Sequence, residues 1–346
     1  MPTLSMLVFM GFVATQPAGG SPDKVTSLDR KTGKTVTLEG LLQESPAGII
    51  VSVGGKEKSR ISAADIIKVE LGDLPGLTAD DKGNLFSLEN EKDYEKAARG
   101  YAALATKSQQ NDRVKRAMEF RELLALAKAV DAKEDAGFKA NAPAVADRFA
   151  AFARANVKSW EVWPATRTAA RLFAELGRHD QAAAQLKALA ATPGLGAELK
   201  VEAKLAEADC LLRSTNASAG RIAVAALLND SEVPATGPLR ERLSIYDLWA
   251  NASSDRLDES MAKIQAAIDA AKSPAARAFG FNARGELFLA SRRPQEAIWE
   301  FLNVDVVYDQ DRDELAKALR RLIDLFERRD EKDRADQCRE RLRKIR

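Results

Sequence analysis

Residues 170–186 read ARLFAELGRHDQAAAQL, and residues 285–301 read GELFLASRRPQEAIWEF. Both stretches have small residues at offsets 0 and 12 and large apolar residues at offsets 3 and 16. Counting offset 7 as well, the positions are Ala170, Phe173, Gly177, Ala182 and Leu186 in the first stretch, and Gly285, Phe288, Arg292, Ala297 and Phe301 in the second. Small residues let two antiparallel helices approach closely, and large apolar residues one turn away fill the space between them. Each stretch therefore predicts a pair of packed helices joined by a turn near offset 7.

This spacing resembles the tetratricopeptide repeat, a pair of helices of 34 residues. A weaker third copy consists of Leu88, Ala97 and Tyr101. All three copies depart from the family at offset 19, where a small residue is preferred and where Leu104, Leu189 and Val304 stand. The resemblance implies an array that binds a protein or peptide. The copies are not separated by multiples of 34 residues, so we do not expect a uniform array.

From Pro75 onward the chain is rich in Ala, Leu, Glu, Lys and Arg with a helical period. Short connections between these segments make neighbouring helices antiparallel and stack them. We therefore expect residues 74–346 to form a mainly α, tetratricopeptide-like α-solenoid that folds independently, with the charged outer faces of the last two helices capping it. The predicted helices are 79–90, 93–107, 112–131, 142–155, 163–176, 179–191, 196–213, 218–228, 237–251, 255–271, 274–290, 294–307, 311–328 and 331–345.

Residues 21–73 have a different pattern, in which short apolar runs alternate with turn residues such as Gly33, Pro46 and Gly54. The pattern predicts strands at about 24–29, 34–43, 48–53, 57–61 and 66–71. The strings TVTLEGLLQES, AGIIVSVGG and ISAADIIKVEL resemble a small Sm-like or bacterial-SH3-like β-barrel. We therefore expect a small β-barrel domain in front of the helices.

Residues 1–20 have the pattern of a secretory signal peptide. Leu4–Ala14 is an apolar run too short to span a bilayer comfortably, and Ala18, Gly19 and Gly20 offer a cleavage site before Ser21. Residues 1–6 contain no Lys or Arg, so the usual basic start is missing. The alternative is a buried N-terminal strand or helix. We expect an exported protein, periplasmic or extracellular and of bacterial type, with no transmembrane span after cleavage.

Composition narrows the possible chemistry. With 53 basic and 51 acidic residues the net charge is only +2, which gives no field that would draw the whole chain to nucleic acid. The single histidine, His179, falls in a predicted solvated turn, so no His-based triad or relay is expected. Cys210 is expected to be buried and Cys338 exposed, and no CxxC is present. We predict no catalytic residue, no cofactor and no metal site.

The tetratricopeptide resemblance also implies where a partner would bind. In that family the first helix of each pair lines the concave face, which places Arg167, Arg171, Asn282 and Glu286 on this face. Arg and Asn side chains can hold a carboxylate or a peptide backbone. The alternative is ordinary surface charge. The four tryptophans, Trp160, Trp163, Trp249 and Trp299, are expected in the packing, and an exposed one would be a candidate anchor.

These observations favour an exported, non-catalytic scaffold that binds a protein or peptide partner through a concave helical face. Two alternatives remain open: a cell-wall or envelope binder that uses the β domain, and a hydrolase with an unrecognised carboxylate site. The sequence predicts neither the partner nor the oligomeric state.

Overall fold

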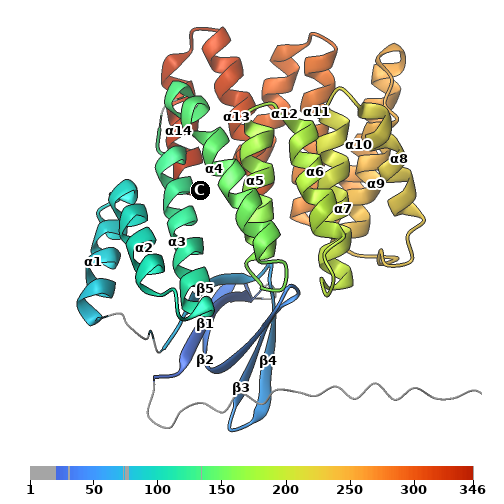
Figure 1. Ribbon diagram of the computed structural model, residues 1–346. Helices are drawn as coiled ribbons and strands as arrows, with labels where there is room; N and C mark the ends of the chain where they lie inside the picture. The colour runs from blue at the N-terminus through green and yellow to red at the C-terminus, as the bar shows by residue number, and fades with distance from the viewer. Residues whose placement is uncertain (1–20, 30–31, 73, 75–77, 134, 346) are drawn as a thin grey trace, which may run out of the picture.

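The computed structural model describes residues 21–29, 32–72, 74, 78–133 and 135–345. Over these residues the chain is mainly helical, with a small antiparallel five-stranded sheet at its N-terminal end (Figure 1). The predicted mainly α class with a preceding β region is confirmed at this level. The predicted signal peptide, residues 1–20, lies outside the described residues.

The sheet consists of β1 (Asp23–Asp29), β2 (Lys34–Ser45), β3 (Gly48–Val53), β4 (Lys56–Ser62) and β5 (Ile66–Glu70), in the order β4-β3-β2-β1-β5. All neighbouring strands are antiparallel. Each strand begins and ends within two residues of its predicted range, because turn residues separate the apolar runs clearly.

The long strand β2 gives the sheet its curvature. Its first half pairs with β1 and its second half, from Leu41, pairs with β3. Gly40 lies at the changeover, where a Cβ atom would stand 2.5 Å from the carbonyl oxygen of Ser52. Only glycine allows such a close approach between strands. The sheet curls around its own apolar side chains, and Val25 and Ile49 are fully buried inside it.

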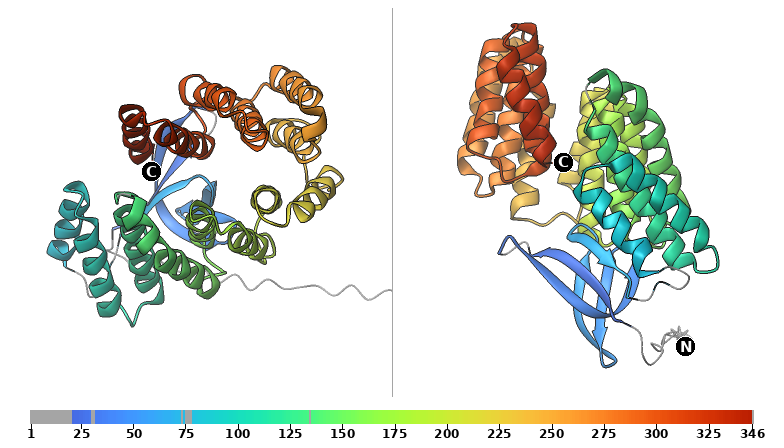
Figure 2. Two further views of the ribbon diagram at one scale, coloured as in Figure 1. Left: turned by 90° about the horizontal axis from the view of Figure 1, so that it is seen from above. Right: turned by 90° about the vertical axis from the view of Figure 1, so that its left-hand side faces the viewer.

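The helices are α1 (Ala79–Asn90), α2 (Tyr94–Lys107), α3 (Asp112–Asp131), α4 (Asp135–Ala155), α5 (Val162–Glu175), α6 (His179–Ala190), α7 (Ala197–Arg213), α8 (Ala217–Leu228), α9 (Pro238–Ala250), α10 (Leu257–Ala270), α11 (Pro274–Ala290), α12 (Pro294–Val306), α13 (Arg312–Arg328) and α14 (Lys332–Ile345). Successive helices run antiparallel and follow one another along an arc. Helices α11 to α14 thereby face helices α3 to α7 across the inside of the arc (Figure 2). None of the helices in the described part of the chain is both long and apolar enough to cross a membrane.

The quoted spacing marks places where two helices approach closely. A Cβ atom at Gly285 in α11 would lie 2.6 Å from the ring of Phe301 in α12. Ala182 and Ala297, the residues at offset 12, are fully buried. Ala97 and Tyr101 of the weaker copy lie in α2 and are also buried, where α2 packs against its neighbours. The small residues are therefore required by the packing of the helix pairs.

We predict that Ala297→Leu lowers the free energy of unfolding by about 1–3 kcal/mol, because the added carbons have no space between α11 and α12. Thermal and urea melts of the full chain would measure the change. Ala132→Leu is the control, since Ala132 is exposed at the end of α3. Equal melting of the two variants would contradict close packing at Ala297.

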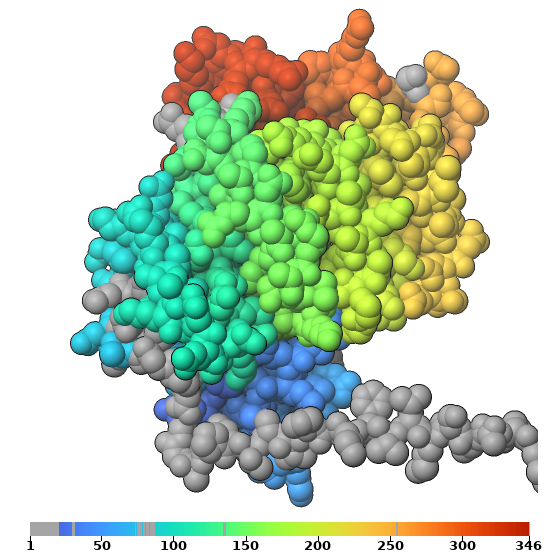
Figure 3. Space-filling model, viewed as in Figure 1, coloured from blue at the N-terminus to red at the C-terminus, as the bar shows by residue number. Residues whose placement is uncertain are grey.

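The sheet and the first helices share one hydrophobic core. A single cluster of buried residues runs from Ile49 and Val51 in the sheet to Phe120 in α3 and Phe149 in α4. Arg113 in α3 also donates to Asp23 and Glu44 of the sheet, over 2.7 Å in both cases. Figure 3 shows the sheet directly against the helices on this face. Because the core is shared, loss of the sheet should also destabilise the first helices, so independent folding of the helical part from about residue 78 stays a prediction that needs a test.

Candidate functional site

The inner side of the arc carries many paired charged side chains, which together we call the inner charged face. It draws on six odd-numbered helices, and its members pair across the arc as well as along it. They are Asp131 of α3; Arg167, Arg171 and Glu175 of α5; Asp209 and Arg213 of α7; Arg242 of α9; Asn282 and Glu286 of α11; and Asp313, Glu314, Lys317, Arg320 and Arg321 of α13.

On α5 the network is organised around Arg171. Its guanidinium donates to Asp131 and to Glu175, each over 2.9 Å. Arg320 of α13 donates to the same Glu175, which is only 4% exposed. This chain of alternating charges links α3, α5 and α13.

Asp209 of α7 lies at the centre of the network. Arg213 and Lys317 donate to its two carboxylate oxygens, each over 3.1 Å, and Lys317 also donates to Glu314 over 2.9 Å. Burial by itself would raise the pKa of Asp209, but these two cations hold that pKa well below its usual value. Asp209 is therefore a buried carboxylate whose charge is stabilised by two fixed partners.

Glu286 and Asn282 connect α11 to the same network. Glu286 accepts from Arg213 and from Arg321, both over 2.8 Å. The Asn282 amide donates to Glu314, to its carboxylate over 2.8 Å and to its backbone carbonyl over 3.0 Å. Two buried nitrogens, Arg213 Nη2 and Arg242 Nε, have no hydrogen-bond acceptor among the described residues.

Arg167 differs from the other cations of the inner charged face. It pairs with Asp313 of α13 across the arc, and both side chains are open to solvent, at 41% and 63%. Its guanidinium also lies over the ring of Trp163, 5.5 Å from the ring centre, and Trp163 is buried. This cation–π contact favours one position of the Arg167 guanidinium.

Across most of the network the cations lie nearer the solvent than their partners. Glu314 is 1% exposed, whereas Lys317 and Arg321 are 30% and 40% exposed. Asp313 is the largest exception, at 63% exposed against 41% for Arg167, and Glu286 at 16% is about as exposed as Arg213 at 14%. The solvent-accessible part of the inner charged face is therefore formed mainly by guanidinium and ammonium groups that are paired with more deeply buried carboxylates.

The four residues that the sequence singled out, Arg167, Arg171, Asn282 and Glu286, all lie on the inner charged face, but each is bonded to another part of the chain. The sequence reasoning missed α7 and α13. In particular, Lys317, Arg320 and Arg321 of α13 turn into the arc, whereas Asp324, Glu327 and Arg328 of the same helix are exposed. Lys317, Arg320 and Arg321 fall within two turns of a strongly amphipathic helix, a pattern that marks a charged face without giving its direction.

His179 is not a solvated turn residue as predicted. It begins α6 and is half-buried, and its Nδ1 atom is a buried atom without a hydrogen bond among the described residues. Burial lowers the pKa of His179 below its usual 6.5, and the nearby Arg213 and Arg321 lower it further. The carboxylates of Asp209 and Glu286 oppose that effect, but the net shift is downward.

His179 therefore takes up a proton at a higher pH in the unfolded chain than in the folded protein. This difference predicts that the folded protein loses stability as pH falls through about 6.5. One proton limits the slope to about 1.4 kcal/mol per pH unit. His179→Gln should flatten the curve of melting temperature against pH between about 7 and 5, with little change above pH 7. Identical curves for the two proteins would contradict the assignment.

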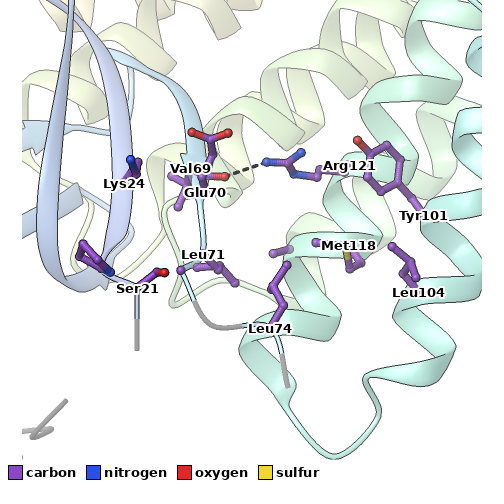
Figure 4. Close-up of a pocket in the computed structure, with 13 residues that line it drawn as sticks. Ser21, Lys24, Val69, Glu70, Leu71, Leu74, Tyr101, Leu104, Met118 and Arg121 are labelled. Atoms are coloured by element: carbon purple, nitrogen blue, oxygen red, sulfur yellow. Dashed lines mark hydrogen bonds between the residues drawn. The ribbon is translucent and has the colours of Figure 1, made fainter. Parts of the chain in front are cut away.

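A second feature is the junction pocket, a cavity of about 410 Å³ between β5 and helices α2 and α3 (Figure 4). Leu71, Leu104 and Met118 give it an apolar lining, and Tyr101 and Arg121 stand at its polar side. Arg121 donates to the carbonyl of Val69 over 3.0 Å. Burial, and the hydrogen bond to Glu89, raise the pKa of Tyr101 to about 12, so it stays a neutral donor.

The remaining candidate residues fall elsewhere. Cys210 and Cys338 are both buried free thiols, so the expected exposure of Cys338 is wrong. Trp160 is buried, whereas Trp299 on α12 is 63% exposed. Among the described residues, no group of His, Cys, Asp or Glu is placed to hold a metal ion.

Comparisons with protein-family models, curated proteins and solved structures found no match.

Proposed function

We propose that this chain is an exported, non-catalytic scaffold that binds an acidic segment of a partner protein on its inner charged face. The observation that carries the proposal is the layering of charge: cations from α5 and α13 are partly open to solvent, and most of their carboxylate partners lie deeper. Partly desolvated Arg and Lys groups held in place by buried acids are suited to carboxylates of a ligand.

The architecture proposed with it is a tetratricopeptide-like solenoid behind a small Sm-like barrel. Close approach at Gly285, the burial of Ala182 and Ala297, and the arc of antiparallel helices support the solenoid. The short antiparallel strands of a tightly curled sheet support the barrel. Export, to the periplasm or outside the cell, rests on residues 1–20 of the sequence alone.

A labelled decaglutamate peptide with an amidated carboxyl terminus would test the proposal by fluorescence anisotropy. We expect it to bind the full chain, and to bind more weakly as salt rises from about 0.05 M to about 0.5 M. The double variant Arg167→Gln/Arg321→Gln should bind at least about tenfold more weakly, because two charge-assisted contacts are lost. Arg171 is not used, since it holds the buried carboxylates of Asp131 and Glu175.

The matched control is Lys58→Gln/Arg343→Gln, which removes two exposed charges from β4 and α14. It should bind the peptide like the wild type. If both double variants bind equally well, the inner charged face is not the binding site, and the sheet with the junction pocket becomes the next surface to test. If the wild type does not bind decaglutamate at all, the proposed function fails.

A further inference from the structure

We propose that Asp313 is an internal competitor that occupies Arg167 in the free protein and is displaced by a carboxylate of the bound partner. This inference rests on the proposed function. It assigns Arg167 as the residue that first receives the partner's carboxylate, and α13 as the part of the chain that responds to binding.

The pair itself supports an exchangeable contact. Arg167 and Asp313 are 146 residues apart in sequence, and their side chains are 41% and 63% exposed. Solvent-exposed ion pairs contribute little to stability, so a second carboxylate can replace the first at small cost. Glu175 and Glu314, at 4% and 1% exposed, lie too deep to be exchanged in this way.

Arg167 is prepared to receive a carboxylate. Trp163 beneath it is buried, and the cation–π contact favours the same position of the guanidinium when Asp313 leaves. The carboxylate of Asp313 shows the kind of group that this position accepts.

Asp313 can also leave without unwinding its helix. The cap of α13 is Asp311, whose side chain accepts from the backbone N–H groups of Asp313 and Glu314 over 3.0 and 3.1 Å. Asp313 contributes a backbone donor to this cap, and its own side chain points to Arg167 instead. Displacing that side chain therefore removes one link between α13 and α5 and keeps the helix start intact.

The test compares Asp313→Asn with Asp333→Asn in the full chain, using the same decaglutamate peptide. Both variants lose one acidic charge, but Asp333 is an exposed residue of α14. We expect Asp313→Asn to bind the peptide about two- to fivefold more tightly than Asp333→Asn does, the range that corresponds to one exposed ion pair. When Arg167→Gln is added to both variants, they should bind the peptide with equal affinity, because Asp313 then has no Arg167 to occupy.

The same measurements with a decaglutamine peptide that has a free carboxyl terminus form the second part of the test. They distinguish binding of a terminal carboxylate from binding of side-chain carboxylates. Tighter binding of this peptide by Asp313→Asn would assign a chain terminus to Arg167, and tighter binding of decaglutamate alone would assign acidic side chains.

If the wild type binds and Arg167→Gln/Arg321→Gln does not, but Asp313→Asn binds no more tightly than Asp333→Asn, only the internal competitor is overturned. If the wild type does not bind decaglutamate, the proposed function fails, and the competitor fails with it.

Discussion

Replacement of Asp209 by Asn is expected to lower the free energy of unfolding by about 3–5 kcal/mol, the range for breaking a buried ion pair from one side. Arg213 and Lys317 both donate to this carboxylate, and its loss leaves each cation with one carboxylate partner of those seen here, Glu286 for Arg213 and Glu314 for Lys317. The amide is nearly the same size, so the loss reports charge and not volume. Urea unfolding of the full chain, followed by circular dichroism, would measure it.

The matched control is Asp336→Asn, because Asp336 pairs with Arg339 on the solvent side of α14 and its side chain is 70% exposed. That variant should stay within about 0.5 kcal/mol of the wild type. If the Asp209 variant is as stable as this control, the inner charged face is a loose assembly of side chains and does not stabilise the fold.

Ile49→Ala is expected to cost about 2–5 kcal/mol and to destabilise the helices together with the sheet. Ile49 is fully buried in β3 and belongs to the cluster that also contains Phe120 and Phe149. Hydrogen exchange followed by mass spectrometry should show faster exchange in α3 and α4 as well as in the strands.

Ile67→Ala removes the same atoms from an exposed position of β5 and serves as the control. It should leave both the melting temperature and the exchange of α3 nearly unchanged. Faster exchange confined to the strands in the Ile49 variant would show that the two parts fold independently after all.

The positions of most helices and strands could be predicted from the sequence, because turn residues and periodic apolar residues act locally. The start of α4 shows the limit of that reasoning. A proline usually stands in the first turn of a helix, so Pro143 predicts a start near residue 142, whereas the helix begins at Asp135 and runs through the proline. Phe138 and Ala142 are buried in the shared core, and this packing outweighs the hydrogen bond that Pro143 cannot donate.

The candidate site could be predicted only in part. The tetratricopeptide resemblance predicts that Arg167 and Glu286 share one face, and both belong to the inner charged face. It could not show that Asp313 and Arg321 would meet them, because these contacts depend on how the whole arc curves. The same gap explains the error on Cys338, which lies among charged residues in sequence but is buried between α13 and α14.

The ion pairs between α13 and the earlier helices have a consequence for synthesis of the chain. Asp209 and Glu175 are made 108 and 145 residues before Lys317 and Arg320, the partners that reach them across the arc. A ribosome-bound chain that ends before α13 therefore holds these two acids without the cations that reach them from α13. Contacts of such long sequence separation form late and slowly. Nascent chains arrested before residue 312 should therefore be more sensitive to protease at α5 and α7 than the released protein.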